Sequence, residues 1–559
     1  MQGDTRTVLG ETRLAPNHAT RPNRLVVLVP GFMGRCSRWA HLRAQLEHEP
    51  GFAPREAQWL DFDHHSNWSS VGRMEELALQ LRARIEAEWI KAGGFNDVIL
   101  VGHSMGGLIV RQAYLLASGA VPGEEASRWA SRVSRVVLMA SLNRGVELKR
   151  APWLRVIAWI VRILPFVPHL RVTDVIRGSD FLTGLRINWI RHFGEIAEAE
   201  RRGARGEDHR GKRSPVIVQL LGTKDGVVDK EDSKDLLAFP GGHYLEVPDA
   251  DHKVLYRIEL APDPALRYAV LREGFVGNFQ NDVVRDSADD PIRRVVFLLH
   301  GIRASNVDAW VKGLERRIKD RDPQHTIVRH PTYGYFTAMR FALPTVRRKN
   351  IAVFQDWYTE ALAEHPTAEF NIIAHSNGTY IFGRSLLATP GMRFTNVALA
   401  GSVLPQDFWQ HSERLRKQIG RIRNDRANRD WPVALLCGAL TGLRMRDVGT
   451  AGFAGFLGGA TDEIAYYPGG HGEALKPDYQ DLLVDFIFGG VAKEPAKLSE
   501  SPGYFRQLSN AMPYLAPILV LAAAAGIGWF VFEGGVVHAQ RAALAALTII
   551  GAYVILDIV

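Results

Sequence analysis

The chain has 559 residues, which is too long for one hydrophobic core, because single cores stop growing at about 250–300 residues. Its hydrophobic content of 46% is ordinary for a globular protein and excludes wholesale disorder. The formal net charge of +8 indicates a solvated basic surface or attraction to anionic lipid. Nucleic-acid binding is not expected, because the sequence has no basic stripe with interleaved aromatic residues and no zinc or helix-turn-helix motif.

The start of the chain, MQGDTRTVLGETRLAP, lacks the apolar core of a secretory signal, so none is expected. The two cysteines, Cys36 and Cys437, lie in different halves of the chain. This pattern offers neither a disulfide framework nor a metal site and fits a reducing compartment. We expect no metal and no other cofactor.

The first half of the chain predicts a strand–turn–helix unit around a serine. Residues 25–30 (LVVLVP) and 97–101 (DVILV) are typical of buried parallel strands, and residues 71–90 have helical periodicity. The second strand runs directly into GHSMGG, and a helical pattern follows. This arrangement is the nucleophile elbow, in which Ser104 would sit on a strained turn. The backbone N–H groups of Met105 and Phe32 would form the oxyanion hole.

A serine hydroxyl needs a base, and the base needs an acid to orient it. Residues 215–222 predict a strand, and Asp225 follows it in a turn; Asp229 is the competing choice. After a short predicted strand at residues 243–247, a loop presents His252. The order Ser, Asp, His is the one expected for this kind of fold, so Asp225 and His252 are the expected acid and base.

The motifs LVPGFMG, VGHSMGGLIVR and TKDGVV, together with the loop histidine, resemble those of lipases and esterases of the α/β-hydrolase superfamily. Within it, the sequence is most similar to GPI-inositol deacylase-like and triacylglycerol lipase-like proteins. The resemblance covers about residues 20–275. It implies hydrolysis of carboxylic esters, above all those of lipids, without a cofactor.

An insertion at about residues 143–213 separates the elbow from the expected acid. Its apolar first part contains Arg155 and Arg162, and Arg171 follows directly. Such an insertion looks like a lipase lid with a basic face for anionic headgroups; the alternative is a helix packed over the core.

The second half repeats the design with little sequence identity. Residues 294–299 and 370–373 predict strands, and the second enters AHSNGT, an elbow with alanine in the first glycine position and Ser376 as the nucleophile. The backbone N–H groups of Ile302 and Asn377 would form its oxyanion hole.

Two aspartates compete for the role of the acid in the second site. Residues 432–438 (PVALLCG) read as a strand, and Asp447 lies beyond its end, with Asp430, just before it, as the alternative. His471 stands in a glycine-rich loop and is the expected base. The second domain is expected to be active, with a degenerate module as the alternative.

The C-terminus contains two uncharged stretches, residues 514–532 and 542–556, separated by a short polar turn. A spanning helix needs about 20 apolar residues, so the pair predicts a transmembrane hairpin at residues 511–559, after a polar linker at 491–510. The catalytic part would then remain on the cytoplasmic side of the inner membrane.

These patterns predict an α/β protein with two tandem α/β-hydrolase domains, at residues 1–280 and 288–490, and a membrane anchor. The predicted function is a membrane-anchored serine hydrolase that cleaves lipid esters through an acyl-enzyme. Its partners would be a lipid or acyl-ester substrate and the membrane, without nucleic acid. The alternatives are a thioesterase, deacylase or peptidase on the same triad, or a membrane-associated scaffold or effector with one vestigial site.

Overall fold

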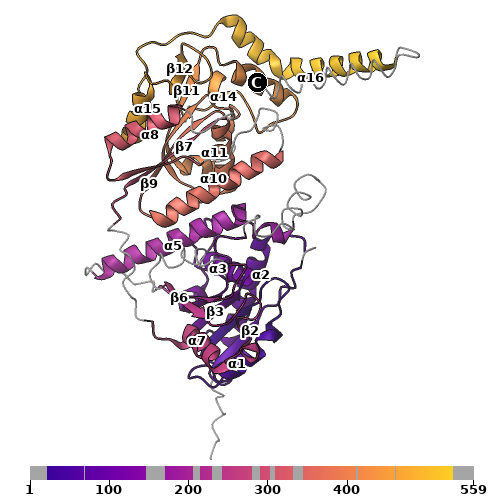
Figure 1. Cartoon of the computed structure of the whole chain (residues 1–559), viewed down its shortest axis with the longest axis vertical. Coiled ribbons are helices and arrows are strands. Elements are labelled where there is room, and N and C mark those ends of the chain that lie inside the picture. The colour runs from indigo at the N-terminus through magenta and orange to yellow at the C-terminus, as the bar shows by residue number, and fades with distance from the viewer. Residues whose placement is uncertain are drawn as a thin grey trace, which may run out of the picture.

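A computed structural model places two α/β domains end to end, with a long helix on the outer side of the second (Figure 1). The described residues are 22–67, 70–146, 170–204, 214–228, 242–279, 290–301, 309–331, 344–410, 413–459 and 461–532.

Domain one is built on a parallel six-stranded sheet of order β2-β1-β3-β4-β5-β6. Its central strands are almost entirely buried apolar residues, because helices cover a parallel sheet on both faces. Helices α2 and α3 lie on the side toward domain two, and α1 and α7 on the side away from it (Figure 1). The elements are β1 (Arg24–Val29), α1 (Ala40–Leu46), β2 (Ala57–Asp61), α2 (Met74–Ala92), β3 (Asp97–His103), α3 (Met105–Ala117), β4 (Val133–Met139), α5 (Asp180–Ala204), β5 (Val216–Gly222), β6 (Gly242–Val247) and α7 (Pro264–Val276).

Domain two repeats this architecture, as the sequence predicts. Its parallel sheet has the order β12-β11-β10-β9-β7-β8, so β7 and β9 lie side by side as β1 and β3 do. Its larger elements are β7 (Arg294–Leu299), α8 (Ala309–Arg321), β8 (Thr326–Arg329), α10 (Pro344–Glu364), β9 (Glu369–His375), α11 (Asn377–Ala388), β10 (Phe394–Ala400), β11 (Ile419–Ala427), β12 (Asp462–Tyr467) and α15 (Gln480–Gly489).

Short helical segments connect these elements. They are η1 (Cys36–Trp39), η2 (Arg128–Arg132), η3 (Arg171–Thr173), η4 (Ile258–Leu260), η6 (Phe408–Gln410), α12 (Glu413–Lys417), η7 (Pro432–Cys437), α13 (Gly438–Gly442), α14 (Ala451–Ala454) and η8 (Glu473–Leu475). The prediction of a strand at residues 432–438 is wrong, because the helical segments η7 and α13 occupy these positions.

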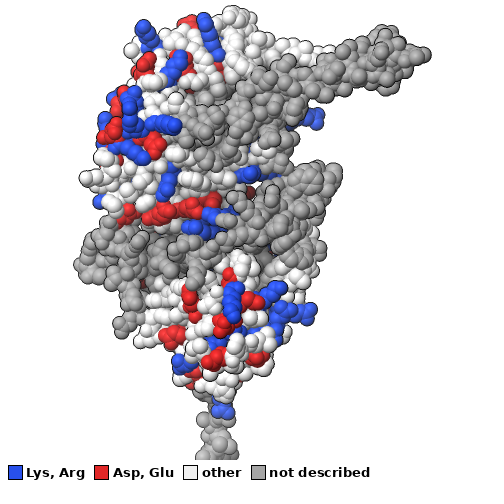
Figure 2. Space-filling view, viewed as in Figure 1, with Lys and Arg blue, Asp and Glu red and all other residues white. Residues whose placement is uncertain are grey.

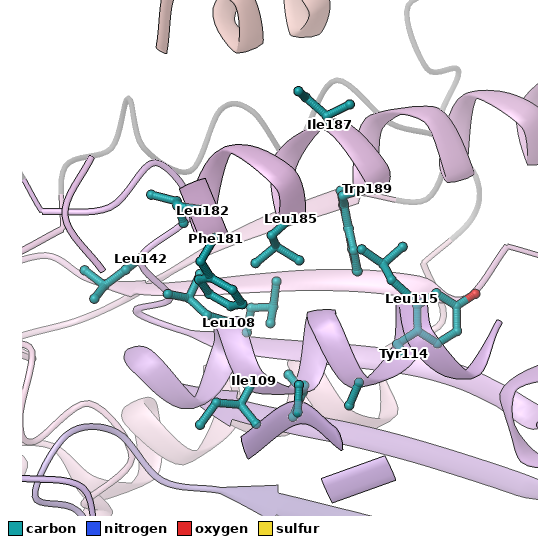
Figure 3. Packing of buried hydrophobic residues seen from close by; sticks show 14 of the residues in the cluster. Leu108, Ile109, Tyr114, Leu115, Leu142, Phe181, Leu182, Leu185, Ile187 and Trp189 are labelled. Carbon is teal, nitrogen blue, oxygen red and sulfur yellow. The ribbon is translucent and has the colours of Figure 1, made fainter. Parts of the chain in front are cut away.

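The described part of the insertion packs in the core rather than over an open pocket. Helix α5 lies between the domains and contacts both α3 and α10. Its apolar residues interleave with those of α3, as Figure 3 shows for Leu185 and Leu108. Trp189 is 1% exposed, and the Arg111 guanidinium lies 4.6 Å from the centre of its ring. The apolar stretch expected to form a lid, residues 151–169, lies outside the described residues.

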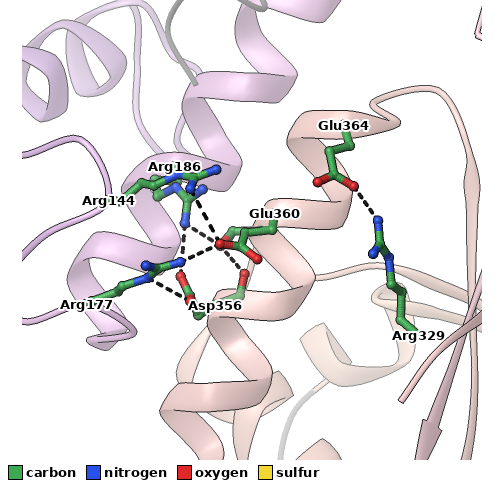
Figure 4. Close-up of polar contacts among 8 residues, drawn as sticks. Arg144, Arg177, Arg186, Arg329, Asp356, Glu360 and Glu364 are labelled. Carbon is green, nitrogen blue, oxygen red and sulfur yellow. Dashed lines mark hydrogen bonds and ion pairs between the residues drawn. The ribbon is translucent and has the colours of Figure 1, made fainter. Parts of the chain in front are cut away.

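Ion pairs also join the two domains near the contact between α5 and α10 (Figure 4). Arg177 donates from Nε to Asp356 at 2.8 Å and also pairs with Glu360 on α10. Arg186 on α5, with a side chain 4% exposed, donates to Thr359 at 2.7 Å. Elsewhere on the face shown in Figure 2, basic and acidic side chains are interspersed over both domains, as on a solvated surface.

The described part of the tail is one helix, not a hairpin. Helix α16 (Gly503–Phe532) begins inside the segment predicted as a linker. Residues 503–526 are long and apolar enough to cross a membrane, with a mean hydropathy of 1.5, and 11% of the helix window is buried. The second predicted span, residues 542–556, lies outside the described residues.

Candidate active site

The first elbow forces its serine into a conformation that side chains rarely adopt. Ser104 has φ 51° and ψ −119°, between the end of β3 and the first turn of α3. A Cβ at Gly106 would lie 2.3 Å from the carbonyl oxygen of Val29, and a Cβ at Gly102 would lie 2.6 Å from that of Gly106. Glycine at both positions therefore lets strand and helix approach closely enough to hold Ser104 at the tip of the turn.

The three residues expected to act together in domain one lie within hydrogen-bonding distance. Nε2 of His252 is 2.8 Å from Oγ of Ser104, and Nδ1 of His252 is 2.9 Å from Oδ2 of Asp225. Because the Asp225 carboxylate accepts the hydrogen on Nδ1 of His252, Nε2 of His252 is left free to accept the serine proton. The competing acid, Asp229, lies outside the described residues.

Asp225 is fixed by its own turn. Its side chain is 1% exposed, and Oδ1 accepts from the backbone N–H groups of Val227 and Val228 at 2.8 and 2.9 Å. Burial raises the pKa of this carboxyl, but the hydrogen bonds from His252 and the two N–H groups outweigh burial, so the net pKa is lowered. Asp225 is therefore ionised at neutral pH and can orient the imidazole.

His103, next to Ser104, fixes the loop that carries His252. Its Nε2 lies 2.7 Å from the carbonyl oxygen of His252; because a carbonyl accepts, Nε2–H of His103 is the donor. Burial and the neighbouring His252 lower the pKa of His103 to about 3, so this imidazole is neutral. The elbow motif alone does not reveal this role of His103, because its partner is a backbone carbonyl far along the chain.

A buried arginine on α7 supports the same loop from behind. Arg267 is 1% exposed and donates to the carbonyl oxygens of Asp249 at 2.8 Å and of Val254 and Arg257 at 3.1 Å. One guanidinium thereby binds three carbonyl oxygens of the segment that follows β6. No motif signals Arg267 in the sequence, because its partners are backbone atoms.

The expected oxyanion donors lie where the elbow and the turn after β1 meet. Met105 is the first residue of α3, where helix N–H groups lack intrahelical partners. A Cβ on Gly31 would lie 2.9 Å from Cβ of Ser104, so the turn that carries Phe32 passes close to the serine. Nε2 of His64, 2.9 Å from the Pro30 carbonyl, holds this turn. The oxyanion role of Phe32 and Met105 stays a prediction.

The second elbow has the same geometry. Ser376 has φ 54° and ψ −123°, and a Cβ at Gly378 would lie 2.4 Å from the carbonyl oxygen of Leu299. Nε2 of His375 lies 3.3 Å from the carbonyl oxygen of His471, as His103 does for His252. Burial and the neighbouring His471 lower the pKa of His375 to about 3.

The acid beside His471 is Asp430, not Asp447. Nδ1 of His471 is 2.9 Å from both carboxylate oxygens of Asp430, whose side chain is fully buried. Asp447 instead accepts from Arg347 and from the hydroxyl of Tyr380, each at 2.7 Å. The expectation for Asp447 is thus corrected, and the alternative acid takes its place.

The second site is less fully assembled than the first. Among the hydrogen bonds of the described residues, none joins Ser376 to His471. Asn377 is the first residue of α11, as Met105 is of α3, whereas Ile302 lies outside the described residues. Within the described ranges, no cluster of three or more His, Cys, Asp or Glu side chains could hold a metal ion.

Residues 26–266 match the model of the alpha/beta hydrolase family, and this part of the chain belongs to that family. No curated protein matches the chain.

Similar solved structures include an esterase from Thermogutta terrifontis, 18% identical, which covers 45% of this chain and 90% of its own, with a TM-score of 0.27. A monoglyceride lipase from Saccharomyces cerevisiae is 12% identical and covers 42% of this chain and 80% of its own, with a TM-score of 0.27. Phospholipase PlaB from Legionella pneumophila is 18% identical and covers 36% and 39%, with a TM-score of 0.24.

Proposed function

We propose that the protein is a membrane-attached serine hydrolase that cleaves carboxylic esters of lipids. The observation that carries the proposal is the continuous chain of contacts from Ser104 through His252 to Asp225, at 2.8 and 2.9 Å, on a strained elbow. Serine, histidine and a buried carboxylate in this geometry are the groups that acyl transfer requires.

In the proposed reaction, Oγ of Ser104 attacks the ester carbonyl while its proton moves to Nε2 of His252. The tetrahedral intermediate places its negative oxygen at the N–H groups of Met105 and Phe32. Its collapse breaks the bond to the alcohol, which takes the proton from His252 and leaves. Water, deprotonated by the same imidazole, then releases the fatty acid and restores the serine.

Lipid is the proposed substrate class because the catalytic domains are joined to an exposed apolar helix. Leu519, Val520 and Leu521 of α16 are 60%, 51% and 70% exposed, which is costly in water and favourable in a bilayer. The elbow and acid-turn motifs resemble those of lipases, which supports the same choice.

Labelling with a serine-reactive fluorophosphonate tests this proposal. The detergent-solubilised wild type is compared with Ser104→Ala, Ser376→Ala and the double variant. We expect Ser104→Ala to remove labelling of domain one and to lower ester hydrolysis at that site by roughly 10⁶-fold. Unchanged hydrolysis in Ser104→Ala would overturn the assignment of the nucleophile.

The second domain has a specific alternative. Because Ser376 makes no hydrogen bond to His471 among the described residues, a vestigial site that only shapes the assembly is the rival to a second working one. Labelling that persists in Ser104→Ala and vanishes in the double variant would establish two working serines. A panel of soluble esters, thioesters and amides separates an esterase from a thioesterase, deacylase or peptidase.

A further inference from the structure

The tail helix is docked on domain two by a close helix–helix contact. A Cβ at Gly442 would lie 2.2 Å from the carbonyl oxygen of Pro513, and one at Gly438 would lie 3.2 Å from Cβ of Met512. The Ser509 hydroxyl, 5% exposed, donates to the carbonyl oxygen of Ala434 at 2.9 Å. Two glycines four positions apart thus let α13 and α16 pack backbone to backbone. The helix therefore leaves the domain in a defined direction.

A basic, partly apolar turn lies where α16 separates from the domain. The chain leaves α13 at Gly442, beside Pro513, and continues as Leu443-Arg444-Met445-Arg446. Leu443 is 45% exposed, and Arg444 and Arg446 are exposed as well. Neither arginine has an acidic partner among the described residues, because the adjacent Asp447 is engaged by Arg347.

We propose that the turn at residues 443–446 rests on the headgroups of an anionic phospholipid bilayer into which α16 extends. An apolar side chain beside two arginines that pair with no described carboxylate suits the headgroup region, where each arginine near an anionic surface contributes favourably. The turn begins where Gly442 contacts Pro513 of the apolar helix α16. A further uncharged stretch, residues 542–556, follows α16 in the sequence. This inference rests on the membrane attachment proposed above.

The contact between α13 and α16 places the proposed bilayer beside the second site rather than the first. Asp430, which contacts His471, also accepts from the N–H of Val433 in η7, the segment that packs against α16. Asp447 fixes the other end of the turn to Tyr380 on α11, the helix that follows Ser376. Figure 1 shows α16 at the end of the molecule remote from domain one. Site two is thus the site held next to lipid.

Fluorescence in reconstituted vesicles tests this surface without requiring catalysis. Cys36 and Cys437 are buried, and burial raises the pKa of both thiols, so an introduced cysteine is the thiol that a maleimide reaches. Leu443→Cys carries an NBD fluorophore in the full chain, and Ile518→Cys, on the exposed part of α16, is the reference. Vesicles contain phosphatidylcholine with or without phosphatidylglycerol, plus a nitroxide-labelled lipid as quencher.

We expect lipid quenching at position 518 in both vesicles, and at position 443 strongly only with phosphatidylglycerol and low salt. Arg444→Gln with Arg446→Gln should weaken docking of the turn by roughly thirty-fold. The matched control, Arg128→Gln with Arg132→Gln, removes the same charge from the exposed surface of domain one and should change nothing.

Quenching at 518 without quenching at 443 would overturn the proposed surface and leave the anchor standing. Absence of quenching at both positions would overturn the membrane attachment as well. Equal quenching at 443 in neutral vesicles would overturn the role of the two arginines. Hydrolysis of a soluble ester, measured in parallel, reports on the proposed chemistry independently.

Discussion

Asp430 stands to His471 as Asp225 stands to His252, with 2.9 Å between carboxylate and Nδ1 in both domains. Both carboxylates occupy the third position after a strand, since β5 ends at Gly222 and β11 at Ala427. The two domains therefore share the position of the aspartate that contacts the histidine as well as that of the serine.

Asn in place of Asp430 should abolish function at site two while Asn in place of Asp447 spares it. An amide does not hold the neutral imidazole in the required tautomer or stabilise the imidazolium, and the comparable change in a serine protease costs roughly 10⁴-fold in kcat. The measurement is the rate of fluorophosphonate labelling of Ser376 in a Ser104→Ala background. Asp447→Asn serves as the matched control, because it removes a carboxylate of the same domain that does not contact His471. Loss of labelling in that control alone would return the role to Asp447.

The composition of strand β11 explains why the sequence favours Asp447 over Asp430 as the acid. Strand β11 reads IGRIRNDRA, and its charges resemble an exposed loop. In the fold, Arg423 is fully buried and pairs with Asp425 at 2.9 Å and with the hydroxyl of Tyr467 at 2.7 Å. These partners come from the same strand and from its neighbour β12, so the periodicity of β11 does not reveal the pairing. The apolar run at residues 432–438 has the more strand-like composition, so the position beyond its end favours Asp447 and leaves Asp430 as the alternative.

The features that could be predicted are those encoded locally. The elbows at Ser104 and Ser376 depend on glycines and on strand–helix order within a few positions, and both domains follow from that pattern. The domain junction could not be predicted, because α5 is amphipathic like many surface helices and its partner α10 lies far along the chain. Helix α16 continues through Pro513, whose contact with Gly442 is likewise nonlocal.

His103 makes the stability of domain one depend on pH. Its pKa is about 3 in the folded chain and about 6.5 when unfolded, so between these values only the unfolded state binds the proton. Stability contributed by the neutral imidazole is complete above pH ~6.5 and falls by about 1.4 kcal/mol per pH unit below it, until pH ~3.

The thermal midpoint should therefore drop on acidification more steeply in the wild type than in His103→Asn. This variant cannot gain the proton, although it is less stable at neutral pH because its shorter amide does not reproduce the contact with the His252 carbonyl. His48→Gln, at an exposed position, should leave the wild-type slope unchanged. Equal slopes in the wild type and His103→Asn would contradict a buried neutral His103.

The ion pairs at the domain junction should contribute far more to the free energy of unfolding than the exposed pair beside them. Asp356→Asn removes the carboxylate that pairs with Arg186 and Arg177, and loss of a carboxylate partner of a nearly buried guanidinium costs about 3 kcal/mol. Arg329→Gln breaks the ion pair with Glu364 drawn in the same figure, but that pair is exposed and contributes about 0–1 kcal/mol (Figure 4).

Calorimetry distinguishes docking of the domains from their separate stabilities. In Asp356→Asn we expect the unfolding of the two domains to separate into two transitions, whereas Arg329→Gln retains the wild-type profile. Adding Arg186→Met to Asp356→Asn should recover part of the loss, because the buried charge that has lost the Asp356 carboxylate is then removed as well. Strictly additive losses in the double variant would mean that Arg186 and Asp356 do not interact, and that the apolar contacts of α5 with α10 hold the domains together by themselves.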